Sequence, residues 1–165
     1  MADVAGLFRR LSAGVYVIGV AEDERRNAFT AAWLMQVSFD PLLLALSVNP
    51  EHASYPLLVG GGGFAVSVLS RDQLHFATHF GIRSARETDK LAGIAWRPGR
   101  TGAPILAEAV AWLECRLTQR IPAGDHEIVI GRPIAGEVLL PDATPLSYAD
   151  TGDLDGSHEL YPDSL

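Results

Sequence analysis

Two long strand-like segments joined by a short turn constrain the fold of this chain more than any other feature of its sequence. Between residues 109 and 121, apolar and polar side chains alternate, with Leu113, Cys115 and Leu117 on one face and Glu114, Arg116 and Thr118 on the other. This period-two pattern is typical of a half-buried strand. Residues 122–125 (PAGD) predict a turn, and a second strand follows from His126 to Leu140, interrupted at Gly131 and Pro133. A hairpin of this kind favours an antiparallel sheet.

Shorter segments complete the pattern of a mainly β protein. Strands are predicted at residues 15–20, 27–48 and 64–69. The second of these is expected to break near Asp40-Pro41, because a proline has no N–H to donate to a sheet ladder. The polar residues 81–93 predict a long loop before the hairpin.

Two or three short helices are predicted beside these strands. Residues 4–11 place apolar side chains on one helical face. A second helix begins at its N-cap, Ser54, and ends at Gly60, a residue that readily takes the left-handed conformation; residues 60–63 (GGGG) are interpreted as a flexible turn. Residues 70–80 predict a third helix behind a capping box of the S-x-x-Q type. Many strands with few short helices favour an antiparallel barrel.

The composition of the chain narrows the classes of function. A length of 165 residues with 48% hydrophobic residues predicts one domain over residues 1–165, in which the acidic residues 153–165 form a loose tail or an arm on a partner subunit. A net charge of -7 argues against nucleic acid or an anionic membrane as a partner. The single cysteine, Cys115, excludes an internal disulfide and a cysteine-based zinc site. With no signal-peptide pattern and no spanning segment, we expect a cytosolic protein.

Three alanines stand where a strand usually carries Val, Ile or an aromatic residue: Ala28, Ala31 and Ala32. Either a flat ligand lies against the main chain there, with the Thr30 hydroxyl and nearby amides as donors, or the strand packs tightly against a helix. Composition alone favours the packed strand.

Other patterns are compatible with binding sites. The helix start at Ser54 presents free amides that can hold a phosphate, or it is an ordinary capped helix. His75 and His79 have the i, i+4 spacing of a metal pair, but no third ligand is apparent, so no metal site is predicted. His126, beside Asp125 at the mouth of a strand, can bind a carboxamide or move a proton, or it closes the hairpin.

Taken together, these segments resemble the flavin reductase-like family, the FMN-binding split barrels. The resemblance covers residues 8–152 and rests on the order and spacing of LSAGVYVIG, NAFTAAWLMQVSFDP, FAVSVLSRDQ, GDHEIVIGRP and PLSYADTG. It implies an antiparallel split β-barrel of the FMN-binding type. The chain departs from the usual pattern at Ala28, at Ser54-Tyr55 and after Gly152, where the usual aromatic residue is absent.

The resemblance also implies a set of site residues. The segment that lines the isoalloxazine ring corresponds to Asn27, Ala28, Thr30, Ala31, Ala32 and Trp33. Ser47, Val48 and Asn49 correspond to residues beside the ribityl chain, Ser54 and Tyr55 to residues that reach the phosphate, and Phe80 and Lys90 to residues that border the cofactor. The turn at Gly124, Asp125 and His126 corresponds to the nicotinamide side, which implies that His126 is the catalytic residue and orients the nicotinamide.

The activity implied by the resemblance is hydride transfer from NAD(P)H to FMN, or to FAD. A homodimer with the flavin near the subunit interface is implied, together with a partner monooxygenase that receives reduced flavin. The reactive chemistry then belongs to the cofactor, and the protein supplies position and electrostatics. Two alternatives stay open: an FMN-binding electron-transfer module without efficient NAD(P)H reduction, and a related barrel for haem or another flat cofactor.

Overall fold

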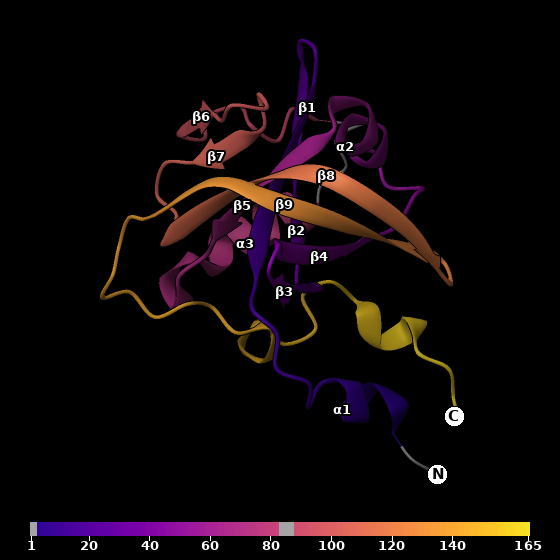
Figure 1. Ribbon diagram of the computed structural model, residues 1–165. Helices are drawn as coiled ribbons and strands as arrows, with labels where there is room; N and C mark the ends of the chain where they lie inside the picture. Colours follow the sequence, from indigo (N-terminus) through magenta and orange to yellow (C-terminus); the bar gives the residue numbers. More distant parts are fainter. Residues whose placement is uncertain (1–2, 83–87) are drawn as a thin grey trace.

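The protein is an arched antiparallel sheet with short helices packed against it, as seen in a computed structural model that describes residues 3–82 and 88–165 (Figure 1). The main sheet has seven strands in the order β2-β1-β5-β8-β9-β4-β3, and each neighbouring pair is antiparallel. Its strands are β1 (Tyr16–Glu22), β2 (Arg25–Ala31), β3 (Leu34–Phe39), β4 (Leu42–Val48), β5 (Gly63–Val68), β8 (Ala111–Ala123) and β9 (His126–Val138). A small second sheet pairs β6 (Trp96–Pro98) with β7 (Pro104–Leu106). The mainly β fold with short helices that the sequence predicts is confirmed.

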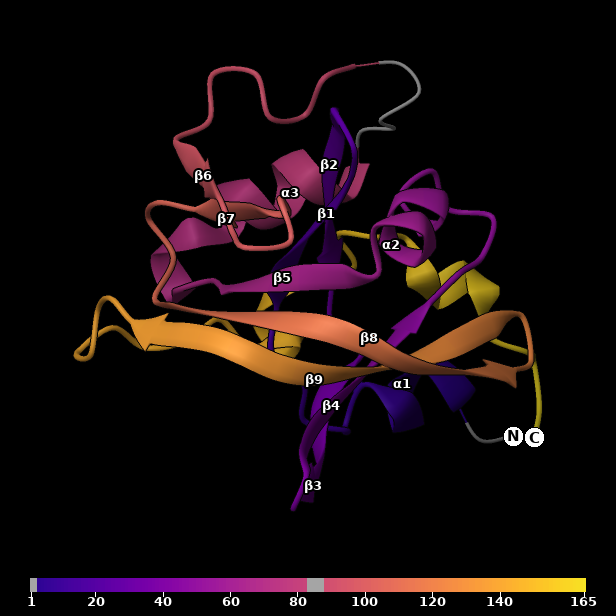
Figure 2. The ribbon, with the colours of Figure 1, turned by 45° about the horizontal axis from the view of Figure 1, so that its top comes forward.

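The strands β2 and β3 follow each other in the chain but form the two opposite edges of the main sheet. β2 pairs with β1, and β3 pairs with β4. The sheet is therefore split between them, and the chain crosses the split at Ala32 and Trp33. The predicted break near Asp40-Pro41 is confirmed as the turn between β3 and β4, and this hairpin projects from the body of the molecule (Figure 2).

The long hairpin that dominates the sequence pattern is confirmed as β8 and β9, each of 13 residues. Gly124 takes a left-handed φ of 66° in the turn between them. The predicted alternation of β8 is kept, because Glu114 pairs with Ala65 and lies on the face opposite Leu113 and Cys115. Its expected exposure is wrong: Glu114 is only 1% exposed, because the loop before β7 covers it, and its carboxylate accepts hydrogen bonds from the backbone amides of Arg100 and Thr101.

Three α-helices lie beside the sheet, and two of them differ from their predicted limits. α1 covers Val4–Phe8 and ends well before residue 11. α2 covers Tyr55–Gly61, and its left-handed C-cap is Gly62 rather than Gly60, so residues 60–63 end a helix and begin β5 instead of forming a flexible turn. The capping box at Ser70 is confirmed, and it leads through the 3₁₀ turn η1 (Arg71–Gln73) into α3 (Leu74–Ile82). Residues 83–87 of the predicted loop lie outside the described residues.

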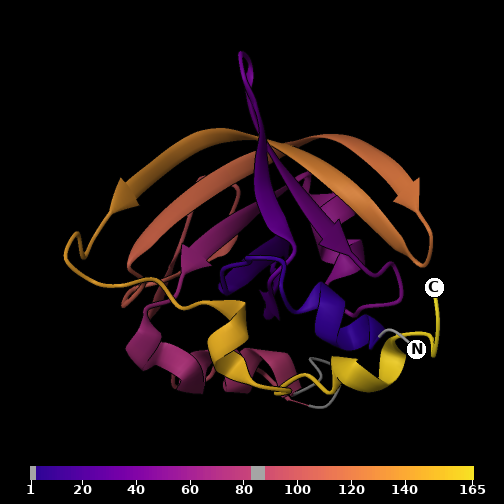
Figure 3. The same ribbon diagram turned by 90° about the horizontal axis from the view of Figure 1, so that it is seen from below.

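The C-terminal segment contains the 3₁₀ turns η2 (Tyr148–Thr151) and η3 (Ser157–Leu160) and lies with α1 and α3 beneath the arch of the sheet (Figure 3). It contacts the N-terminal part of the chain: Arg9 Nη2 lies 2.7 Å from Asp153 Oδ1, and the rings of Phe8 and Tyr161 have centroids 5.5 Å apart. Residues 153–161 therefore pack against α1 of their own chain, which differs from the predicted loose tail.

The apolar core has two main parts on either side of the first hairpin. Side chains of β1, β4, β5 and α2 form one part, which includes Ile18, Leu46 and Phe64. The other part joins β1 and β2 to α3 and includes Ala28 and Phe80. None of the helices in the described part of the chain combines the length and apolar character needed to cross a membrane.

Candidate functional site

The alanine-containing segment at the split in the sheet borders two hollows in the protein surface. The small hollow, of about 100 Å³, is lined by Val15, Thr30, Ala31, Ala32, Ala77, Gly81, Tyr148, Thr151, Leu154 and Asp155. The large hollow, of about 400 Å³, is lined by Phe8, Leu11, Ser12, Ala13, Ala32, Trp33, Leu34, Met35, Ala45, Ser47, Ile128, Tyr148 and Tyr161. Ala32 and Tyr148 line both hollows, so the two hollows meet there.

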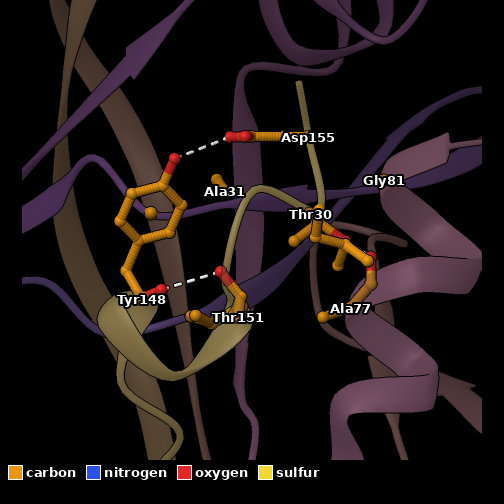
Figure 4. A pocket seen from close by; sticks show the side chains of 10 residues that line it. Thr30, Ala31, Ala77, Gly81, Tyr148, Thr151 and Asp155 are labelled. Carbon is orange, nitrogen blue, oxygen red and sulfur yellow. Dashed lines mark hydrogen bonds between the residues drawn. The ribbon is translucent and has the colours of Figure 1, made fainter. Parts of the chain in front are cut away.

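In the small hollow, the end of β2 faces the C-terminal segment (Figure 4). The Thr30 hydroxyl donates a hydrogen bond to the carbonyl of Ala77 at 2.7 Å and so links β2 to α3. Because its proton takes part in this bond, the hydroxyl does not donate to a ligand as the sequence predicts. On the other side, Tyr148 donates its hydroxyl to Asp155 Oδ2 at 2.9 Å. Burial raises the pKa of Tyr148 above its usual value, so the phenol stays protonated at neutral pH.

The large hollow lies over β3, β4 and β9 and is bordered by aromatic side chains. The Trp33 side chain, at 54% exposure, is unusually open to solvent for a residue of its size. Its ring lies 5.0 Å from the ring of His126, centroid to centroid, with the two planes tilted by 54°. Ile128, two residues along β9 from His126, lines the hollow, in agreement with the prediction that these side chains share a face.

His126 is held at the mouth of the β8–β9 hairpin by its sequence neighbour. Its Nδ1 lies 2.8 Å from Asp125 Oδ1. This hydrogen bond lowers the pKa of Asp125, so the carboxylate is ionised at neutral pH and can only accept. The proton of this hydrogen bond therefore resides on Nδ1 of His126.

Several predicted site residues lie in the interior instead. Asn27 Nδ2 donates to Ser54 Oγ at 2.5 Å, and both residues are buried. Val48 belongs to the core part formed by β1, β4, β5 and α2. Ala28 is fully buried against α3, so the packed-strand interpretation holds at this position, whereas Ala31 and Ala32 face the hollows.

Phe80 and Lys90 are also interior, at the C-terminal end of α3. Phe80 is fully buried, and its carbonyl accepts a hydrogen bond from Lys90 Nζ at 2.9 Å. Burial lowers the pKa of Lys90. The Lys90 carbonyl lies 2.7 Å from His79 Nε2, which occupies one nitrogen of the pair considered for a metal. Among the residues that the structure describes, no group of three His, Cys, Asp or Glu side chains could hold a metal ion.

Asn49 and Tyr55 lie near the start of α2 and outside both hollows. Asn49 Oδ1 accepts from the amide of Glu51 at 2.9 Å. Tyr55 donates to Glu127 Oε2 at 2.6 Å and accepts from Arg120 Nη1 at 3.0 Å. The bond to Glu127 is the main cause that raises the pKa of Tyr55. The structure thus brings together Thr30, Ala31, Ala32, Trp33, Ser47 and His126, while the other predicted residues support them or lie apart.

Sequence reasoning missed the walls that come from the chain ends. Tyr148, Leu154 and Asp155 close the small hollow, and Phe8 and Tyr161 border the large one. The PLSYADTG segment contributed to the resemblance, but nothing in its pattern indicated where it packs. Cys115 takes no part in either hollow: burial and the neighbouring Glu114 raise the pKa of its thiol to about 12, so it stays unreactive.

Comparison with known proteins identifies the family. The model of the flavin reductase like domain matches residues 8–155. The chain belongs to the flavin reductase-like family. A relative named high molecular weight rubredoxin, from Moorella thermoacetica, is 37% identical over 84% of the chain, and the match spans only 61% of that longer protein.

Two solved structures of the same fold are close to this member of the family. The NADH:FAD oxidoreductase SgcE6 of Streptomyces globisporus superimposes with a TM-score of 0.81 at 29% identity, covering 88% of this chain and 86% of that one. SgcE6 has also been solved in complex with NAD and FAD fragments. BorF, the flavin reductase component of a bacterial two-component tryptophan halogenase, superimposes with a TM-score of 0.74 at 34% identity, covering 86% of this chain and 94% of that one.

The two hollows offer the space that the family's flavin cofactor needs. Pockets for small molecules and cofactors have volumes of roughly 300–1,000 Å³ and mainly apolar walls. The large hollow falls in this range, and the small hollow extends it past Ala32 to Ala31. On the β2 side, Ala31 and Ala32 present only methyl groups, so a flat ring system can approach the main chain there, with Tyr148 as the facing side chain of both hollows. The residues present therefore fit a flavin.

Proposed function

We propose that this protein is an NAD(P)H:flavin oxidoreductase that transfers a hydride from NADH or NADPH to FMN or FAD. The observation that carries the proposal is the pair of adjacent hollows beside Ala31 and Ala32, with His126 packed against Trp33, which lines the larger one. The name of SgcE6, an NADH:FAD oxidoreductase of similar length, supports both the donor and the acceptor. The choice between the two nicotinamide donors and between the two flavins is open in this proposal.

When bound, a flavin supplies the ring that accepts the hydride, and the side chains of the protein position the reactants. Ala31 and Ala32 leave the main chain open along one wall, so the ring can lie close to backbone donors. Phe8 and Leu11 border the large hollow with apolar groups that exclude water. Thr30, tied to Ala77, keeps the end of β2 in place.

His126 orients the nicotinamide in this proposal. Its Nδ1 carries the proton that is donated to Asp125, so in the neutral form of the ring its Nε2 is an acceptor. An acceptor at this position matches the amide N–H₂ of a nicotinamide carboxamide. Trp33 packs beside the imidazole and limits its rotation. His126 then contributes by orientation, and no covalent bond to the protein forms.

The remaining predicted residues would act around the cofactor. Ser47 lines the large hollow and faces a ribityl chain, whereas Val48 and Asn49 hold the end of β4. The buried pair Asn27 and Ser54 fixes the start of α2. Tyr55, at the start of the same helix, stays the predicted contact of the phosphate.

We also propose that the protein is a homodimer with the flavin near the interface. Large apolar side chains are exposed along β3 and the start of β4: Met35, Val37, Phe39 and Leu42, with Phe39 at 88% exposure. β3 is an edge strand of the main sheet, and an exposed apolar edge is unfavourable unless another surface covers it. Met35 and Trp33 also line the large hollow, so a second copy on this hairpin would adjoin the site.

BorF supports a partner enzyme that receives the reduced flavin, because it is the reductase component of a two-component system. We propose that the partner enzyme of this protein is a monooxygenase. A cytosolic location stays a prediction that rests on the cysteine content.

A second candidate function is an FMN-binding electron-transfer module without efficient NAD(P)H reduction. It is favoured by the relative from Moorella thermoacetica, which is named a rubredoxin and is longer than the match. As part of such a protein, the domain would exchange electrons with a neighbouring domain.

Anaerobic mixing of the flavin-loaded protein with NADH and with NADPH separates the two candidates. We expect the visible absorption band of oxidised flavin to bleach with at least one donor. A flavin that stays oxidised with both donors would leave the electron-transfer module as the explanation. The absorption spectrum of the purified protein, taken first, distinguishes a flavin from haem or another flat cofactor.

A further inference from the structure

The wall of the small hollow that faces Ala31 carries a carboxylate, that of Asp155 (Figure 4). Two hydrogen bonds fix it: Tyr148 donates its hydroxyl to Oδ2 at 2.9 Å, and the amide of Ser157 donates to Oδ1 at 3.1 Å. The Tyr148 hydroxyl also lies 3.0 Å from Ser157 Oγ. The carboxylate therefore has a defined position and does not swing freely into solvent.

The segment that bears Asp155 is itself anchored. The neighbouring Asp153 forms a salt bridge with Arg9, in which Nη2 and Oδ1 lie 2.7 Å apart. It also accepts a hydrogen bond from the backbone amide of His158 at 3.2 Å. Within the described residues, no salt bridge includes Asp155. In the described part of the chain, neutral hydrogen-bond donors contact this carboxylate, and no cationic side chain pairs with it.

Asp155 is ionised at neutral pH. Burial alone would raise the pKa of its carboxyl, but the hydrogen bonds from Ser157 and Tyr148 outweigh this effect and lower the pKa below its usual value. A ligand in the small hollow therefore meets a negative charge opposite Ala31.

We infer that Asp155 makes the site bind oxidised flavin in preference to reduced flavin and so favours release of the product. The inference rests on the proposed function. A hydride brings two electrons and one proton from the nicotinamide, so the isoalloxazine ring gains one negative charge while the nicotinamide becomes a cation. A fixed carboxylate beside the ring destabilises the charged ring and leaves the neutral ring almost unaffected.

The expected effect is moderate, because Asp155 is exposed at the edge of the hollow and is screened by water and salt. We expect the ratio of the dissociation constants for reduced and oxidised FMN to fall about tenfold in Asp155→Asn. For a two-electron couple, a tenfold change corresponds to a rise of about 30 mV in the midpoint potential of the bound flavin. The difference between the proteins should shrink as salt is added.

The experiment measures both dissociation constants without turnover. Photoreduced and oxidised FMN are titrated anaerobically into the apoprotein, and quenching of tryptophan fluorescence reports binding, since Trp33 borders the large hollow. Asparagine has nearly the shape of aspartate, and its Oδ1 can still accept from the Ser157 amide, whereas its Nδ2 can only donate, so the contact with the Tyr148 hydroxyl has to reverse direction. The control Asp163→Asn removes one negative charge from the same segment but away from the hollow.

The inference stands if the ratio falls in Asp155→Asn and is unchanged in Asp163→Asn. It is overturned if the ratio is unchanged in Asp155→Asn, even where both affinities drop, because Asp155 would then be only a wall. An equal fall in both variants overturns it too, since net charge would explain it. Asp155→Glu keeps the charge and should keep the wild-type ratio if the asparagine variant is unstable. Failure of the wild-type protein to bind any flavin would instead refute the proposed function.

Discussion

Replacement of Ala31 by leucine tests whether the ring of the cofactor lies against the end of β2. Ala31 is the last residue of β2, pairs with Tyr16 and faces Tyr148 across the small hollow (Figure 4). An isobutyl group in place of the methyl would occupy this space. Because Ala31 borders a hollow, the apoprotein should lose less than about 1 kcal/mol, in the range of substitutions outside tightly packed sites.

The expected magnitude follows from binding linkage. Oxidised FMN at a concentration of 100 times its dissociation constant stabilises a protein that binds it by about 2.7 kcal/mol. For a chain of this size, each kcal/mol raises the melting temperature by about 2–4 °C, so the wild-type protein should gain about 5–11 °C. In Ala31→Leu we expect no gain, since the ring and the side chain would compete for the same space.

Thermal unfolding followed by circular dichroism, with and without FMN, measures this shift. Ala107→Leu is the matched control, because Ala107 is exposed in the loop after β7 and lines neither hollow. Ala28→Leu gives the contrast: Ala28 is fully buried against α3, so overpacking should destabilise the apoprotein by about 1–3 kcal/mol. A folded Ala31→Leu protein with the full wild-type shift would refute the placement of the ring.

Further predictions concern the donor site, the core, the interface and pH. His126→Ala should raise the KM for NADH and NADPH by about tenfold, the worth of one hydrogen bond, with the dissociation constant of FMN changed less than about twofold; an equal loss in both would contradict an orienting role. Glu114→Ala removes a buried carboxylate that accepts from two partly buried backbone amides and should lower the free energy of unfolding in urea by about 1–3 kcal/mol. Phe39→Asp should convert a dimer to monomers in sedimentation velocity, whereas Val138→Asp, at another exposed apolar position, should not. The folded pKa of Asp155 is below its usual 3.8, so its contribution to stability is present above that value and is lost as pH falls through the folded pKa. The difference in stability between wild type and Asp155→Asn should therefore vanish in acid urea titrations, and a constant difference would contradict the shift.

The strands of this fold could be predicted from sequence because their signal is local. Three patterns predicted them: the alternation along residues 109–121, the PAGD turn and the proline at position 41. Each pattern depends only on residues that are adjacent in the sequence. Glu114 shows what local alternation leaves out. Alternation predicts the face of its side chain, but Glu114 is buried because a loop covers that face, and no periodicity in the sequence predicts where the loop residues Arg100 and Thr101 lie.

The sequence likewise predicted some residues of the candidate site and missed others. Ala31 and Ala32 stand out in the sequence because alanine is unusual in strands, and both line the hollows. Ala28 is an equally unusual alanine in a strand, but it packs against α3. It lies three residues before Ala31, so the two side chains point to opposite faces of β2. The walls from Phe8, Tyr148 and Asp155 depend on contacts between the two ends of the chain, and composition reveals nothing of such contacts.

The split in the sheet explains why small side chains gather at one point. The ladder to β1 ends at Ala31, and the ladder to β4 begins where Trp33 accepts a hydrogen bond from the amide of Ser47 at 3.0 Å. Ala32 lies between the two ladders, at the one place where the chain passes from one edge of the sheet to the other, and it lines both hollows. In a closed barrel, β2 and β3 would pair and their side chains would fill this space. The separation of the two edge strands therefore creates the room for a flat cofactor, and it leaves the apolar edge of β3 exposed, where the proposed second subunit would bind.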